Sequence, residues 1–302
     1  VSSLGKYVEI FEKMFCEYCD TKYSLTTANG TVALHLALAA LGINQEDEVI
    51  VPDFTFVATA NAVKYLGAKV ITVDIDEETY CISPKAIEKA ITSKTKAIVP
   101  VHLYGHPANM DEINKIAKKH KIVTVCDNTW ATPLFCQPFN LGINIIIDAG
   151  TKYINGHADV LIGFVSSDKK TAKQIRTTKN TLGMCPGSEE VYLTLRGLPT
   201  LSLRMKEIEN NALVLAKSLL QHSLVKDVYH PALPHTKNHK IWKRDFTGSS
   251  GLFGFTLKKA YSKKMIEKFY NKLKIFRIGY SWGGFESLIT FPSLIKRSIG
   301  NN

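Results

Sequence analysis

Two side chains with complementary chemistry, Asp127 and Lys152, follow two consecutive apolar runs. Residues 122–125 precede Cys126 and Asp127, and residues 145–147 precede the segment Asp-Ala-Gly-Thr-Lys-Tyr, which contains Lys152. A lysine amine forms a Schiff base with an aldehyde, and a carboxylate keeps a pyridine nitrogen protonated. At one edge of a sheet, these are the groups that pyridoxal phosphate (PLP) needs. We therefore predict PLP as the cofactor and catalytic roles for both residues.

The pattern around this pair predicts an α/β fold. Short β-branched runs alternate with helical segments, which is typical of a mostly parallel sheet covered by helices on both faces. Ser83-Pro84 and Asn109 are helix start signals. Ligands of such sheets bind at the carboxyl ends of the strands, where Asp127 and Lys152 fall. The predicted strands span residues 48–51, 70–74, 97–101, 122–125, 143–147 and 160–165.

The C-terminal third predicts a second, smaller domain. An amphipathic helix over residues 206–221 leads into a strand-like run at 251–257 and a helix at 263–273. We therefore divide the chain into a large cofactor domain, residues 1–205, and a small α+β domain, residues 206–302, whose end looks truncated.

Two further motifs are candidates for cofactor contacts. Asn29-Gly-Thr31 opens an apolar helix over residues 32–41, and free N–H groups at a helix start bind phosphate, while Gly30 permits close approach. A capped turn is the simpler interpretation of the same motif. Phe54 and Phe56 follow the first strand of the alternating region, and for both rings the residues alone favour core packing over stacking on a cofactor.

Composition excludes several classes of partner. The chain has 302 residues, of which 45% are hydrophobic, and no apolar run of about twenty residues predicts a membrane span. The net charge of +11 comes from scattered lysines without interleaved aromatic residues, so we expect no nucleic-acid partner. Six cysteines include one CxxC pair without a second pair, and the histidines lack ligand spacing, so we expect no metal site.

The cysteine pattern and the N-terminus bear on location. Scattered cysteines fit a reducing compartment, and the N-terminus has no apolar signal core, so a cytoplasmic location is expected. The chain begins with Val rather than Met, which indicates a fragment or a trimmed protein.

The sequence also resembles two families of PLP enzymes. Residues from about 3 to 121 resemble DegT-type sugar aminotransferases, and residues from about 122 onward resemble cystathionine β-lyases, so the chain reads as a chimera with a junction near residue 122. The aminotransferase-like segments include Thr27-Ala-Asn-Gly-Thr-Val-Ala-Leu-His, Pro52-Asp-Phe-Thr-Phe-Val-Ala-Thr and Pro100-Val-His-Leu-Tyr-Gly. The lyase-like segments include Asp127-Asn-Thr-Trp-Ala-Thr-Pro, Gly150-Thr-Lys-Tyr-Ile-Asn-Gly-His and Tyr280-Ser-Trp-Gly-Gly-Phe-Glu-Ser. Both families have the fold-type-I architecture, which implies a seven-stranded sheet.

The resemblance implies roles for individual residues. From the aminotransferases, Gly30 and Thr31 would bind the phosphate and Phe56 would stack on the ring, which reverses the preference for core packing at Phe56. The lyase resemblance implies the remaining roles: Asp127 at the pyridine nitrogen, Thr129 at the ring, Thr151 near the phosphate, Lys152 in the Schiff base, Ser281 and Trp282 at the substrate carboxylate, and Lys296 where lyases carry a carboxylate-binding Arg. Both families build active sites between subunits, which implies a homodimer or homotetramer.

The chain departs from both patterns at several positions. Ala149 replaces a serine that in the lyases lies near the phosphate, and Lys296 is a poor substitute for a bidentate Arg. The lyases' own N-terminal half and the aminotransferases' own catalytic lysine segment are both absent.

The favoured function is a carbon–sulfur lyase that cleaves cystathionine or a related cysteine thioether, an amino-acid substrate, by β-elimination. The first alternative is transamination of a nucleotide keto-sugar. The second is an inactive, PLP-binding chimera.

Overall fold

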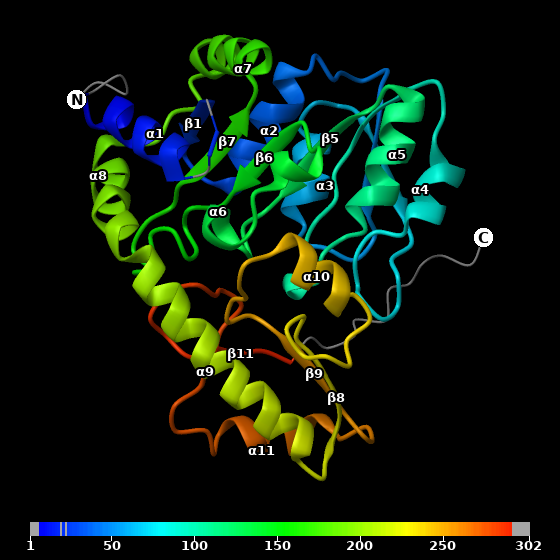
Figure 1. Ribbon diagram of the computed structural model, residues 1–302, viewed down its shortest axis with the longest axis vertical. Coiled ribbons are helices and arrows are strands. Elements are labelled where there is room, and N and C mark those ends of the chain that lie inside the picture. Colours follow the sequence, from blue (N-terminus) through cyan, green and yellow to red (C-terminus); the bar gives the residue numbers. More distant parts are fainter. Residues whose placement is uncertain (1–5, 19, 22, 292–302) are drawn as a thin grey trace.

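The central element of the computed structural model is a seven-stranded sheet (Figure 1). The structure describes residues 6–18, 20–21 and 23–291. The strand order is β1-β7-β6-β5-β4-β2-β3; β7 is antiparallel to its neighbours β1 and β6, and the other neighbouring strands are parallel. The strands are β1 (Tyr23–Thr27), β2 (Glu48–Pro52), β3 (Lys69–Val73), β4 (Thr95–Ile98), β5 (Val123–Asp127), β6 (Ile145–Asp148) and β7 (Gly163–Ser167).

Helices cover both faces of this sheet, because successive strand residues point to opposite faces and both sets are apolar. Val49 and Val51 pack in the cluster that contains residues of α2 (Gly30–Ala40), α3 (Ala58–Lys64) and α7 (Lys169–Leu182). Ile50 packs in the cluster on the opposite face, with residues of α4 (Pro84–Ala90) and α5 (Met110–His120). A third cluster joins the β7 end of the sheet to α1 (Lys6–Tyr18) and α8 (Ser188–Gly197).

The long helix α9 (Leu201–Gln221) continues from α8 and ends beside a small C-terminal unit (Figure 1). The strands β8 (Val225–Tyr229) and β9 (Gly254–Leu257) form an antiparallel pair there, and β10 (Arg277–Ile278) and β11 (Leu288–Ile289) form a parallel pair. The remaining helices are α6 (Thr132–Phe135), α10 (His239–Asp245), α11 (Lys263–Tyr270) and three short 3₁₀ turns at Leu103–Gly105, Pro138–Leu141 and Leu198–Thr200.

Capping residues in the sequence mark the N-termini of three helices. The side chains of Asn29, Ser83 and Asn109 each accept a hydrogen bond from the backbone N–H group three residues later, as N-caps do. The expected α/β class and mostly parallel sheet are confirmed. None of the helices in the described residues is long and apolar enough to cross a membrane.

Several strands differ from the prediction. Strand β4 begins two residues and ends three residues earlier than the predicted range 97–101, and β8, β10 and β11 were not predicted. Strand β1 was not expected, because Tyr-Ser-Leu-Thr-Thr lacks a continuous apolar run, and it forms by pairing with β7 more than a hundred residues later. The predicted strand over residues 160–165 is instead β7, two or three residues later and antiparallel to β6. Helix α9 begins at Leu201 rather than at residue 206. The division into domains at residue 205 stays a prediction.

Candidate active site

Asp127 is the last residue of β5, in the middle of the sheet. The register pairs Asp127 with Ile147 of β6, and an isolated bridge joins it to Val101, which follows β4. Because side chains alternate along a strand, Asp127 shares the face of Val125, which packs in the cluster that contains residues of α2. The carboxyl group therefore lies at the carboxyl edge of the sheet, on the side covered by α2.

Thr129 ties the end of β5 to the segment that carries the lysine. Its backbone N–H donates to Asp127 Oδ1 at 2.9 Å, and its hydroxyl oxygen accepts a hydrogen bond from the Ala149 N–H at 2.8 Å. Thr129 is buried. The residue that the lyase resemblance placed at the cofactor ring thus bridges Asp127 and the start of the turn that contains Lys152.

Lys152 lies in a tight turn directly after β6. Its N–H donates to the Ala149 carbonyl at 3.0 Å, and its own carbonyl accepts from the Gly156 N–H at 2.9 Å. The Asn155 N–H donates to the Gly150 carbonyl at 2.9 Å. These three bonds make residues 149–156 a helix-like turn that fixes the backbone of Lys152 at the same sheet edge as Asp127.

The segment from Ser281 to Gly284 brings two further predicted residues to Lys152. The Lys152 amine donates a hydrogen bond to the Ser281 hydroxyl at 2.9 Å and lies 5.2 Å from the centre of the Trp282 ring. Gly283 has φ +86°, and a Cβ there would lie 2.8 Å from the Lys152 carbonyl carbon. A glycine is needed both for this backbone conformation and for this close approach.

Asp127 and Lys152 influence each other electrostatically. Burial raises the pKa of Asp127, while hydrogen bonds from Thr129 and the positive charge of Lys152 act in the opposite direction. Burial lowers the pKa of Lys152, opposed by the negative charge of Asp127. A lysine with a lowered pKa has a larger neutral fraction, which is the form that attacks an aldehyde or accepts a proton.

The start of helix α2 offers a place for a phosphate beside this pair. The Asn29 side chain accepts from the Val32 N–H, and the first N–H groups of a helix have no intrahelical acceptor, which leaves those of Gly30 and Thr31 for a ligand. A Cβ on Gly30 would lie only 2.8 Å from the Ala149 Cβ, so α2 begins directly against the segment before Lys152. A helix start, an amine and a carboxyl group at one edge of the sheet are the groups that PLP needs, and the phosphate-binding role of Gly30 and Thr31 stays a prediction.

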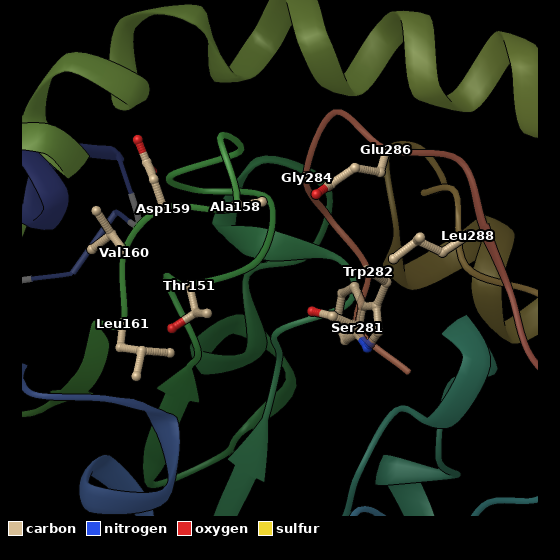
Figure 2. A pocket seen from close by; sticks show the side chains of 10 residues that line it. All are labelled: Thr151, Ala158, Asp159, Val160, Leu161, Ser281, Trp282, Gly284, Glu286 and Leu288. Atoms are coloured by element: carbon tan, nitrogen blue, oxygen red, sulfur yellow. The ribbon is translucent and has the colours of Figure 1, made fainter. Parts of the chain in front are cut away.

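A cavity of about 450 Å³ adjoins the site. Figure 2 shows Thr151 between two walls, with Asp159, Val160 and Leu161 on one side and Ser281 and Trp282 on the other. Its lining mixes apolar and polar groups, which suits an amphipathic small molecule. The remaining lining residues are Ala158, Gly284, Glu286 and Leu288.

Three residues with predicted roles lie elsewhere or are otherwise engaged. The Thr151 hydroxyl donates to the Ile162 carbonyl and accepts from the Ile162 N–H, so it is tied to the protein backbone. Phe56 is 69% exposed, whereas the half-buried Phe54 ring lies beside Tyr80 and Tyr104. Lys296 lies outside the described residues. The roles of Thr151, Phe56 and Lys296 stay predictions.

The sequence analysis did not identify three residues that belong to, or contact, the segment around Lys152. Asp148 ends β6 as a buried carboxyl group, on whose pKa the Asn128 side chain and the negative charge of Asp127 act in opposite directions. Arg204 binds the turn after Lys152 through its guanidinium. Gly283 touches the Lys152 backbone. Only Gly283 carried a local signal, the Gly-Gly pair after Trp282.

Comparison with known proteins places this site in a family. The family model described as Cys/Met metabolism PLP-dependent enzyme matches residues 6–298. The cystathionine beta-lyase of Escherichia coli is 40% identical over 201 residues, which are 67% of this chain and 50% of that protein. The cystathionine gamma-lyase of Sus scrofa is 34% identical over 296 residues, covering 95% of this chain and 71% of that protein.

Solved structures agree with the sequence matches. The crystal structure of cystathionine gamma synthase from Xanthomonas oryzae pv. oryzae, in complex with aminoacrylate and cysteine, superimposes with a TM-score of 0.85 at 28% identity. The match covers 95% of this chain and 74% of that one. The fold-type-I architecture expected from the resemblance is thereby confirmed.

One family model spans both halves of the chain. It covers the residues that we assigned to sugar aminotransferases as well as those assigned to the lyases, so the predicted chimera with a junction near residue 122 gains no support. The expected PLP cofactor is confirmed at the level of the family. The chain belongs to the family of PLP-dependent enzymes of cysteine and methionine metabolism.

Proposed function

We propose that this chain is a carbon–sulfur lyase that cleaves cystathionine or a related cysteine thioether by β-elimination. The observation that carries the proposal is the hydrogen bond from the Lys152 amine to Ser281, beside a cavity and in electrostatic contact with Asp127. The cystathionine beta-lyase of Escherichia coli supports the choice of reaction. One mole of thioether and one of water would give one mole each of thiol, pyruvate and ammonia.

PLP, when bound, supplies an electron sink for the bonds of the substrate α-carbon. Gly30 and Thr31 would hold its phosphate, and Asp127 would hold the proton on its ring nitrogen. In the absence of substrate, Lys152 would bind the cofactor covalently. Its amine, once released, would take the α-proton and return a proton to the departing sulfur, a general acid–base contribution of about 10²–10⁴-fold.

Ser281 and Trp282 would orient the substrate. The Ser281 hydroxyl can bond either the Lys152 amine, as seen here, or the substrate carboxylate when the amine turns to the α-carbon. The Trp282 ring packs against Tyr153, with ring centres 5.2 Å apart, which limits its freedom. The adjoining cavity would receive the part of the thioether that leaves.

The test is a product assay with purified, PLP-loaded protein and cystathionine. β-Elimination releases pyruvate and homocysteine, and Lys152→Ala serves as the inactive control. Pyruvate formation no greater than in this control would reject the proposal.

γ-Elimination is a second candidate, supported by the Sus scrofa relative, which matches 95% of this chain. It would yield 2-oxobutyrate and cysteine instead of pyruvate and homocysteine. Chromatography of the keto acids from the same reaction therefore separates the two functions.

We also propose that the chain forms a homodimer or homotetramer. Three large apolar side chains at helix α3, Phe56, Val57 and Tyr65, are each at least 60% exposed, which suits an interface between subunits. Light scattering on the eluting protein measures the mass directly, and a monomer at micromolar concentration would reject the proposal.

A further inference from the structure

The guanidinium group of Arg204, in the first turn of α9, makes four hydrogen bonds. Its Nη1 donates to the Tyr153 carbonyl at 2.6 Å, and its Nη2 donates to the carbonyls of Ile154 at 3.1 Å and Gly197 at 2.9 Å. Its Nε donates to the Thr200 hydroxyl at 3.1 Å. The first two acceptors are the residues that directly follow Lys152. One side chain therefore joins the turn of residues 149–156, called the lysine turn below, to the junction of α8 and α9.

The backbone around Arg204 is shaped for this contact. Gly156 has φ +75°, and a Cβ there would lie 2.0 Å from Arg204 Nη1. A Cβ on Gly197 would lie 2.5 Å from the Asn155 carbonyl oxygen. Both glycines permit an approach that any other residue would block. The lysine turn and the end of α8 thus close around the guanidinium from two sides.

The chemistry of these bonds points to positioning rather than to charge pairing. All four acceptors are carbonyl or hydroxyl oxygens, and none is a carboxylate. Burial lowers the pKa of Arg204, while an electrostatic interaction with Tyr18 acts in the opposite direction. Desolvation of the charge is unfavourable, and none of the carboxylates in the described residues forms an ion pair with Arg204. The planar guanidinium group has five N–H donors and can donate hydrogen bonds to several carbonyl groups at once. The single ammonium group of lysine cannot do so in the same geometry.

We infer that Arg204 is a positioning residue, which holds the turn of residues 149–156 so that the Lys152 amine reaches its reacting partner. It touches the backbone after Lys152 and acts through Lys152. The inference rests on the proposed function only for its kinetic consequence. Its structural consequence, the order of the lysine turn, can be measured without any substrate.

The first experiment measures hydrogen exchange of the backbone amides of residues 152–156 in cofactor-free wild type and Arg204→Lys. These amides include the Asn155 and Gly156 N–H groups, which bond within the turn. We expect exchange at least about tenfold faster in the variant. Arg176→Lys, which changes an exposed arginine 3.5 Å from Glu12, should leave this segment unchanged. Gly156→Ala, which would displace the guanidinium, should reproduce the faster exchange.

The second experiment compares PLP-loaded enzymes and expresses kcat per mole of bound cofactor. A lysine misplaced by about 1 Å should lower kcat roughly 10²-fold, with KM changed by less than about threefold. A lower melting temperature with normal kcat per bound cofactor would show a merely structural role and overturn the inference. So would exchange in Arg204→Lys within about twofold of wild type. If wild type cleaves no thioether, the proposed function fails, while hydrogen exchange still decides the role of Arg204.

Discussion

The side-chain nitrogen of Lys152 lies 2.9 Å from the hydroxyl oxygen of Ser281, a residue 129 positions later in the chain. Lys152 follows a strand of the central sheet, whereas Ser281 lies between the short strands β10 and β11 of the C-terminal unit. The contact therefore couples the placement of the reactive amine to the packing of that unit against the sheet edge.

This contact predicts the effect of Ser281→Ala. The hydroxyl that would bond the substrate carboxylate is lost, and a hydrogen bond to a charged group contributes about 1.5–3 kcal/mol, so kcat/KM should fall about tenfold or more. The measurement is steady-state pyruvate release from cystathionine. Ser287→Ala, an exposed serine of the same segment, is the matched control. Equal kcat/KM in the two variants would contradict a role for Ser281 in orienting the substrate.

Gly283→Ala should be strongly disruptive. The new Cβ would need the positive φ of +86° and would lie within 2.9 Å of three Lys152 and Tyr153 backbone atoms. We expect a loss of about 1–3 kcal/mol in the free energy of unfolding, measured in urea, together with reduced activity. At Gly254, in strand β9, the nearest atom to an added Cβ is 4.0 Å away, so Gly254→Ala should be mild. A Gly283→Ala variant as stable and active as Gly254→Ala would show that the segment does not press on Lys152.

Much of the sheet could be predicted from the sequence, and the reason is local. Buried parallel strands are continuous β-branched runs, so β2, β5 and β6 carry their own signal, and Asp127 and Lys152 follow from their position after such runs. Strand β1 carries no such run and depends on its partner β7, so its existence is decided by tertiary pairing.

Contacts between distant segments could not be predicted in the same way. Spacing alone does not bring Ser281 to Lys152, and only the resemblance to a family indicated it. Arg204 sits on an amphipathic helix, where an arginine normally indicates a solvated face. Here its guanidinium group points inward, which requires the close approach that Gly156 and Gly197 permit. That approach can be recognised only in the folded structure, where the lysine turn lies against the end of α8.

Asp127→Asn should separate cofactor binding from catalysis. A neutral amide cannot hold the positive ring nitrogen as a carboxylate does, so kcat should fall roughly 10²-fold or more while PLP still binds. Fluorescence titration with PLP and pyruvate release measure the two properties. Asp127→Glu keeps the charge and should retain more activity than Asp127→Asn. If Asp127→Asn kept wild-type kcat, Asp127 would not be the partner of the ring nitrogen.

Asp148 predicts a pH dependence of stability. Burial raises its pKa to about 8, far above the usual value for aspartic acid, and the negative charge of Asp127 adds to the effect. Between the ordinary pKa of aspartic acid, which applies to the unfolded chain, and the raised pKa of the folded protein, Asp148 binds a proton in the folded state but not in the unfolded state. The contribution of Asp148 to stability is therefore lost as the pH rises, by up to about 1.4 kcal/mol per pH unit.

The test compares urea unfolding of wild type and Asp148→Asn from pH 5 to pH 8. The variant cannot titrate at this position, so its stability relative to wild type should increase with pH. Glu46→Gln, at an exposed acidic residue, should show no such trend. A difference between Asp148→Asn and wild type that stays constant over this range would contradict the raised pKa.

The most direct test of the central claim identifies the lysine that binds PLP. Borohydride reduction of the PLP-loaded protein, followed by peptide mass mapping, locates the bound cofactor. The site predicts a single modified peptide that contains Lys152, and its disappearance in Lys152→Ala. Modification of another lysine in the wild-type protein, with Lys152 unmodified, would contradict it.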